Sequence, residues 1–297
     1  MYEIQIQYAT LISFKHACER IKCEEMRLSP NKTCIFTPNR NNMKINTTFF
    51  SATNTTRTIV TELSKTISTD IKTYNITNNS LKEDIHIASD EVLLVGMPVY
   101  AGRIPSVAVE SLKHFKGSHT PVILVSVYGN REFDDIFVEM QDIFEANGFF
   151  VIAAAAFIAQ HSIFPRTAKG RPDTSDFQKI NEFAQSCKKI IDKGFAPEAK
   201  SISLPGNRPY KIPGNIPLKV TTSSKCTECH ACIRVCPVNA IPADNPHVTD
   251  YTKCIHCGRC IYVCAEHARH YGGLLYHVAG SVFGWKNRKR KEPQFFF

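Results

Sequence analysis

The sequence predicts an α/β fold, in which helices cover both faces of a parallel sheet, followed by a small cysteine-rich domain. Short continuous apolar runs at 92–95, 122–127 and 149–156 suit parallel strands that are buried on both faces. Helical segments alternate with these runs, and such alternation indicates a parallel sheet with right-handed crossovers. Eight of the twelve cysteines then fall between Cys226 and Cys264, which marks a second domain of different character.

The remaining elements of the α/β part follow from their local patterns. MKINTTFF at 43–50 reads as the first strand, and 71–76 as the second. Between them lies a hydroxyl-rich turn and then a helix whose apolar positions are Ile59, Val60 and Leu63. Later helices are expected near residues 107–115, 134–147 and 176–193.

Length and composition indicate about two domains and argue against a membrane-spanning or secreted protein. The chain has 297 residues, 43% of them hydrophobic, which suits a globular protein with a substantial core. The longest apolar run, 149–159, is too short to span a bilayer. The N-terminus lacks the basic region and cleavage site of a signal peptide, so we expect a cytoplasmic, reducing and oxygen-poor setting.

The formal net charge of +9 is concentrated partly in the segment 286–291. A basic cluster of this kind can meet nucleic acid, a membrane surface or an acidic partner protein. We expect instead a solvated basic tail, with no nucleic acid bound and no membrane span.

The chain divides into five parts. The N-terminal extension contains a possible helix at 17–26 and three cysteines without metal-like spacing, Cys18, Cys23 and Cys34, and Met43 is a possible alternative start. A linker rich in proline and glycine breaks any regular pattern after the sheet. One amphipathic piece near 274–282 lies in the basic tail. The boundaries we expect are 1–42 for the extension, 43–194 for the α/β domain, 195–223 for the linker, 224–268 for the cysteine-rich domain and 269–297 for the tail.

The two cysteine runs predict two 4Fe–4S clusters. Each run has the spacing C-x2-C-x2-C-x3-C, which is typical of bacterial iron–sulfur proteins whose fourth cysteine ligates the other cluster. Three thiolates two residues apart can reach three corners of a cubane from one loop, and the fourth corner needs another segment. Zinc sites and disulfide frameworks fit this repeated run poorly. We therefore expect Cys226, Cys229, Cys232 and Cys264 at cluster one, and Cys254, Cys257, Cys260 and Cys236 at cluster two.

Three strand-end loops predict a ligand site in the α/β domain. The turn Ser51–Thr56 precedes a helix, where backbone N–H groups and hydroxyls can bind phosphate, although such residues also cap ordinary helices. The loops 96–103 and 127–131 each bring a tyrosine whose face can stack on a flavin ring. In open α/β sheets, ligands bind at the carboxyl ends of the strands.

These features together resemble a known family. The segments FFSATNTTR, GMPVYAGRIP, VYGNREFDD, AQHS and LPGNRPYK, with the two cysteine runs, resemble the flavodoxin–ferredoxin fusion proteins of anaerobes over residues 43–297. The resemblance implies a flavodoxin-like sheet of order 2-1-3-4-5, a bacterial ferredoxin-like α+β domain, and FMN. By position it implies a phosphate loop at Ser51, Thr53, Asn54, Thr55 and Thr56, and ring-binding loops at Pro98, Val99, Tyr100, Gly102, Arg103, Tyr128, Gly129 and Asn130.

The phosphate loop departs from the family pattern because Ala52, Asn54 and Thr55 stand where glycines are usual. Asparagine tolerates the left-handed conformation, whereas threonine at 55 is strained if a positive φ is needed there. His161 follows the last parallel strand beside the expected flavin edge, either as a proton relay or as a structural histidine. No nicotinamide or ATP fingerprint is present, so electrons must come from another protein or a small donor.

The sequence favours an electron-transfer protein that passes low-potential electrons between flavin, cluster one, cluster two and an unidentified redox partner. Three alternatives stay open. The first is an FMN-dependent oxidoreductase that acts on a small substrate. The second is a ferredoxin on a flavin-free flavodoxin scaffold, and the third is a redox or iron sensor.

Overall fold

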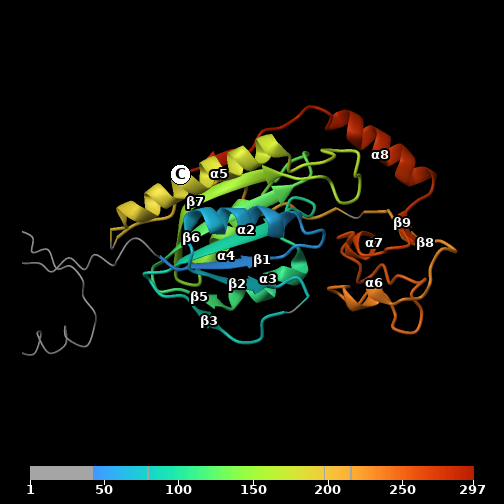
Figure 1. Ribbon diagram of the computed structural model, residues 1–297, viewed down its shortest axis with the longest axis horizontal. Coiled ribbons are helices and arrows are strands. Elements are labelled where there is room, and N and C mark those ends of the chain that lie inside the picture. Colours follow the sequence, from blue (N-terminus) through green and yellow to red (C-terminus); the bar gives the residue numbers. More distant parts are fainter. Residues whose placement is uncertain (1–42, 79, 197, 215) are drawn as a thin grey trace, which may run out of the picture. The chain divides into compact units, whose positions relative to one another are not determined.

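A computed structural model describes residues 43–78, 80–196, 198–214 and 216–297, and residues 44–297 form one unit. The helix expected at 17–26 and the cysteines Cys18, Cys23 and Cys34 lie outside the described residues. Figure 1 shows the order of the elements along the chain.

Five parallel strands make the centre of the fold. They are β1 (Ile45–Phe49), β2 (Ile71–Asn75), β4 (Val92–Pro98), β6 (Thr120–Tyr128) and β7 (Phe149–Ile158). The full sheet has the order β10-β7-β6-β4-β1-β2. When the parallel strands are numbered along the chain, this order is 2-1-3-4-5, which confirms the predicted flavodoxin-like sheet.

Four helices follow the strands, as the alternating pattern predicts. They are α2 (Thr55–Ile67), α3 (Ser106–Lys113), α4 (Ile136–Glu145) and α5 (Thr174–Lys193). Helices α2 and α5 pack against each other, and α3 packs against α4 (Figure 1). A small two-stranded sheet of β3 (Ile85–His86) and β5 (Phe115–Lys116) lies beside them.

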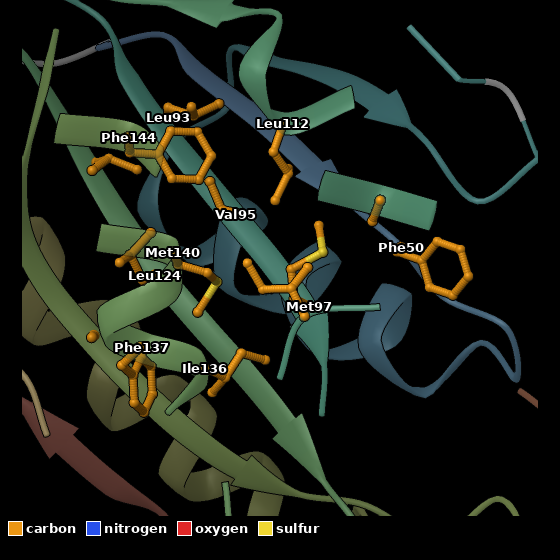
Figure 2. Packing of buried hydrophobic residues seen from close by; sticks show 14 of the residues in the cluster. Phe50, Leu93, Val95, Met97, Leu112, Leu124, Ile136, Phe137, Met140 and Phe144 are labelled. Atoms are coloured by element: carbon orange, nitrogen blue, oxygen red, sulfur yellow. The ribbon is translucent and has the colours of Figure 1, made fainter. Parts of the chain in front are cut away.

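The core fills the space between the sheet and the helices. Figure 2 shows Leu93, Val95 and Met97 of β4 beside Met140 and Phe144 of α4, all of them buried. This packing accounts for the continuous apolar runs in the strands, because side chains on both faces of β4 and β6 are covered. Cys187 in α5 is fully buried, and burial raises the pKa of its thiol, as expected for a core cysteine.

The C-terminal segment is not a solvated tail, so that prediction is wrong. It forms helix α8 (Leu274–Lys286) and strand β10 (Gln294–Phe296), which pairs antiparallel with β7 as a sixth strand. Phe296 packs against Phe133 and Phe137, with ring centroids 6.4 and 5.4 Å apart. The prediction was based on the basic residues before the strand and overlooked the apolar side chains that follow them. These side chains join the core at the edge of the sheet.

The linker lies along helix α4. The Asp135 carboxylate accepts hydrogen bonds from the backbone N–H groups of Asn207 and Lys211 at 2.8 and 2.7 Å. Burial alone would raise the pKa of Asp135, but these hydrogen bonds hold it below its usual value. The Arg208 guanidinium forms an ion pair with Asp142, which lies further along α4 than Asp135 does. The segment is therefore tied down by its own polar side chains and by α4.

The cysteine-rich region contains two similar halves. Each half has a one-turn helix, α6 (Ala231–Arg234) or α7 (Arg259–Tyr262), and strands β8 (Val220–Thr222) and β9 (Arg269–Tyr271) pair antiparallel beside them. Among the described helices, none is long and apolar enough to cross a bilayer.

Candidate cofactor sites

The two cysteine runs adopt the same local geometry. In both, the residue before the one-turn helix is left-handed, with φ of 60° at His230 and 72° at Gly258. In both, the last sulfur accepts a backbone N–H bond four residues on, from Ala240 to Cys236 Sγ and from Ala268 to Cys264 Sγ, at 3.2 Å each. Donors of this kind stabilise a thiolate. The repeated spacing in the sequence therefore gives a repeated structure.

The pKa shifts of the second run indicate that Cys236 lies beside it. Burial raises the pKa of Cys257 to about 12, and the neighbouring thiols Cys260, Cys236 and Cys254 contribute in the same direction. Cys236 likewise acts on Cys254 and Cys260. The fourth cysteine of the first run thus lies with the first three of the second, as crossed ligation requires.

The cysteines fit a cluster by their chemistry. All eight are free thiols. Among the described residues, no group of three or more His, Cys, Asp or Glu is arranged to hold a single metal ion. The ligand assignment therefore rests on the spacing of the runs and on the grouping of Cys236.

Arg269 supplies a further sign that negative charge belongs beside the second run. Its side chain is 2% exposed, it donates to Pro246 O at 2.6 Å and to Thr249 Oγ1, and its Nε has no partner in the described part of the chain. Burial raises the pKa of Cys260, and the positive charge of Arg269 opposes this increase. A buried guanidinium without a carboxylate needs another anion, and a cluster bound by four thiolates is one. Sequence reasoning passed over Arg269, since a lone arginine after a cysteine run carries no pattern.

A cavity of about 710 Å³ lies at the carboxyl ends of the parallel strands. The loops after β1, β4 and β6 line it, and so do residues 254–256 of the second cysteine run. The linker contributes Lys211, Pro213, Gly214, Ile216 and Leu218. Nine of the predicted flavin-site residues lie in this lining: Thr53, Thr55, Thr56, Pro98, Val99, Tyr100, Gly102, Tyr128 and Gly129.

Four predicted residues do not line the cavity, because their side chains have other partners. Ser51 Oγ accepts from Arg57 N at 3.1 Å. Arg103 makes a two-pronged ion pair with Glu139, with both distances 2.7 Å. Asn54 and Asn130 bind other parts of the chain through their side-chain amides. The prediction placed these residues in the correct loops but not at the cavity wall.

The phosphate loop is compatible with its lack of glycine. Asn54 is left-handed, with φ of 64°, and it occupies the N-cap position of α2. Thr55 is the first residue of the helix, so no positive φ is needed there. Asparagine is one of the residues that adopt this conformation readily. The first turn of α2 contains no acidic residue, which leaves its N-terminus suited to an anion.

Two tyrosines of the cavity wall have raised pKa values. Burial, with Cys257 nearby, raises the pKa of Tyr100 well above its usual value. Burial, with Glu132 nearby, raises the pKa of Tyr128 to about 12. Both therefore remain protonated at neutral pH, and both line the cavity.

His161 lies in the cavity wall as a neutral side chain. Burial, with Arg131 nearby, lowers its pKa to about 4. Its Nδ1 lies 3.1 Å from the backbone N–H groups of Ile163 and Phe164, which donate to it. The proton of the neutral ring is therefore on Nε2. These bonds favour the structural interpretation and leave Nε2–H as a donor.

The cysteine-rich region also contacts the phosphate loop directly. Arg259 Nη1 donates to Ser51 O at 3.0 Å and to Ala52 O at 3.4 Å. Asn54 Nδ2 donates to the Tyr262 hydroxyl at 3.2 Å. Arg259 and Tyr262 are the first and last residues of α7, so the helix that carries Cys260 is bound to the loop that precedes α2. The sequence holds no signal for contacts more than two hundred residues apart.

Comparison with known proteins agrees with this division. Residues 218–265 match the family model of the 4Fe-4S dicluster domain. The chain carries a flavodoxin-like sheet followed by a 4Fe–4S dicluster domain. This is the layout that the resemblance to flavodoxin–ferredoxin fusions implies. No curated protein matches the chain.

Solved flavodoxins are also similar to part of the chain. A Fusobacterium nucleatum flavodoxin bound to flavin mononucleotide is 18% identical, covering 49% of this chain and 97% of its own, with a TM-score of 0.35. A short-chain flavodoxin associated with a non-canonical PDU bacterial microcompartment is 13% identical, covering 50% and 99%, with a TM-score of 0.36. The fold assignment rests on the strand order, not on these likenesses.

Proposed function

We propose that the chain is an electron-transfer protein that binds FMN in the 710 Å³ cavity and two 4Fe–4S clusters on the cysteine runs. The observation that carries this proposal is the shared wall of the cavity. Loops of the flavodoxin-like sheet line it together with Cys254, Ile255 and His256 of the second run. When bound, FMN exchanges one or two electrons and each cluster exchanges one, which joins two-electron donors to one-electron acceptors.

The chain's own residues would hold the flavin by its two ends. The hydroxyls of Thr53, Thr55 and Thr56 and the N-terminal N–H groups of α2 would bind the phosphate. Tyr100 and Tyr128 would pack against the ring, and the Nε2–H of His161 would donate to an acceptor at its edge.

The cavity also supports an order for electron transfer that differs from the order expected from sequence. Cys254, a predicted ligand of cluster two, lies in the cavity wall. The predicted ligands of cluster one are absent from that wall among the described residues. The proposed path therefore runs from flavin to cluster two to cluster one, with the redox partner beyond it.

The remaining parts of the proposal concern the surroundings. The partner is a redox protein or a small donor, because the chain shows no nicotinamide fingerprint. A reducing, cytoplasmic setting suits the proposed clusters, because their ligands are thiolates and oxidising compartments favour disulfides.

Anaerobic purification with iron, sulfide and flavin analysis tests the proposal. We expect about eight irons and about one FMN per chain, because the two runs supply ligands for two cubanes. About eight irons without flavin would indicate a ferredoxin on a flavin-free scaffold. Fewer than about four irons would exclude two cubanes.

The variant Cys236→Ser tests the crossed assignment and the path. It should alter the paramagnetic resonance of cluster two and slow electron transfer from the flavin to cluster one. Cys187→Ser is the matched control, because it removes a buried cysteine in α5, outside both runs. A change confined to cluster one would contradict the assignment.

A further inference from the structure

Helix α8 has apolar side chains on two faces, and only the inner face packs against the rest of the described chain. The Tyr276 hydroxyl donates to Ile163 O at 3.0 Å, and the rings of Tyr276 and Phe283 lie 5.6 and 4.9 Å from the ring of Phe164. Phe283 also lines the flavin cavity. This inner side fixes the helix on the body of the protein.

The outer side of α8 carries a row of exposed apolar residues. Leu275, Val278, Val282 and Trp285 follow the spacing i, i+3, i+7, i+10, which places them on one face. Their exposed fractions are 55%, 53%, 49% and 65%, and Leu274 at the helix start is 80% exposed. A contiguous apolar row of this kind marks an interaction surface.

Positive charge without a carboxylate partner among the described residues lies at the end of this row, where the Arg288 guanidinium is 5.7 Å from the centre of the Trp285 ring. Lys286, Arg288 and Lys289 are exposed, and no carboxylate within the described ranges pairs with them. Arg290 and Lys291 differ, since they pair with Asp173 and Glu132. The sequence contains no aspartate or glutamate from 267 to 291, so nothing in this stretch offsets the charge.

We propose that the outer face of α8 binds the surface of a bilayer that contains anionic lipid. An apolar row with a tryptophan beside cations is typical of helices that lie in the interface plane. With thirteen residues, α8 is about 20 Å long, which is shorter than the hydrocarbon core of about 30 Å. Trp285 and the three cations would lie at the headgroups, with the apolar row just below them. A second copy of the chain would bring more positive charge to the same face.

Only the width of α8 separates this surface from the cavity. Phe283 lines the cavity, and its neighbour Val282 is exposed on the outer face. The proposed contact therefore places the flavodoxin-like domain against the membrane through a helix that lines its cavity. The inference does not depend on whether FMN is bound.

Intrinsic fluorescence tests the proposal in the full chain, because Trp285 is its single tryptophan. Vesicles of equal parts phosphatidylcholine and phosphatidylserine should shift the Trp285 emission to the blue and carry the protein down on sedimentation. Vesicles of phosphatidylcholine alone should bind it far more weakly.

Two variants separate the contributions. Replacing Lys286, Arg288 and Lys289 by glutamine should weaken binding on the order of a hundredfold, at roughly fivefold for each charge. The same change at the exposed Lys65, Lys82 and Lys193 is the control for net charge and should leave binding almost unchanged. Leu275→Ser with Val282→Ser should weaken binding about tenfold or more while the tryptophan remains as reporter.

Three outcomes would overturn the proposal. One is the absence of binding to the anionic vesicles, and another is equal weakening by the two charge variants. The third is a dimer in solution that Leu275→Ser with Val282→Ser dissociates, which would assign the apolar row to a second copy. Iron content and circular dichroism of each variant establish that it is folded.

Discussion

Replacement of Arg269 by glutamine should make the reduction potential of cluster two more negative. The guanidinium is buried, acts on Cys260 and Cys254, and has no carboxylate partner among the described residues. Reduction adds one negative charge to a cluster, and a fixed cation nearby favours that charge. Arg269→Gln removes the cation and keeps a polar side chain beside Pro246 O and Thr249 Oγ1.

The size of the effect follows from Coulomb's law. With an effective dielectric constant of about 20, a unit charge about 7 Å away stabilises the added electron by about 2 kcal/mol. For a one-electron couple, this energy corresponds to about 100 mV, because 59 mV is a tenfold change in the equilibrium constant. Cluster one should shift less, since the thiols on which Arg269 acts, Cys254 and Cys260, are predicted ligands of cluster two.

A redox titration followed by paramagnetic resonance measures both midpoints, with the signals assigned through Cys236→Ser. Arg269→Lys retains the charge and should shift cluster two far less than the glutamine variant does. Lys225→Gln removes an exposed charge next to Cys226, where solvent screening should keep the shift small. If Arg269→Gln holds its full iron content and its cluster two midpoint stays within about 20 mV of the parent value, the electrostatic reasoning is wrong.

Three other changes have defined outcomes. Gly129→Ala would place a Cβ 2.4 Å from His161 Cδ2, so the ring must move, and we expect a lower flavin-to-iron ratio on analysis. The pKa of His161 is about 4 in the folded chain and about 6.5 when unfolded, so this neutral ring costs stability progressively as the pH falls below about 6.5, by about 1 kcal/mol between pH 7 and about pH 5.5. Urea unfolding should show a weaker pH dependence in His161→Gln than in the parent, because burial also lowers the pKa of His256 and that contribution remains in both. Asn130→Ala removes amide bonds to Asn287 O and Lys289 O at 2.8 and 2.9 Å, which should lower the free energy of unfolding by about 2 kcal/mol and speed proteolysis near β10.

Two of these predictions have a result that would contradict them, and the third has a matched control. An unchanged flavin-to-iron ratio in Gly129→Ala would show that the ring of His161 does not position the flavin. Equal acid sensitivity of the parent and His161→Gln would exclude that histidine as the titrating group. Ser126→Ala in β6 is a control for Asn130→Ala, because its buried hydroxyl has no partner in the described part of the chain and its loss should cost less.

The α/β elements could be predicted from sequence because their signals are local. The apolar runs of β4, β6 and β7 record burial on both faces, and the intervening helices carry their own periodicity. Two strands extend beyond the predicted bounds, β4 to Pro98 and β7 to Ile158, because their pairing with β6 continues to those residues.

The phosphate loop shows the same division at a single residue. Composition predicts that Asn54 tolerates a left-handed conformation, and its φ of 64° agrees. Contacts with distant segments determine which loop side chains reach the cavity. Arg103 and Asn130 have partners in α4 and in the C-terminal segment, and those partners lie 36 and more than 150 positions away in the chain.

The sequence by itself determined the parallel α/β order, the two cysteine runs and the loops at the ends of the strands, because each depends on residues close together in the chain. Only the tertiary structure decided that β10 completes the sheet, that Arg269 is buried beside Cys260, and that Cys254 shares a cavity with the flavodoxin-like loops. These features depend on contacts between distant segments, whose energy comes from burial and charge in three dimensions and leaves no periodic trace along the chain.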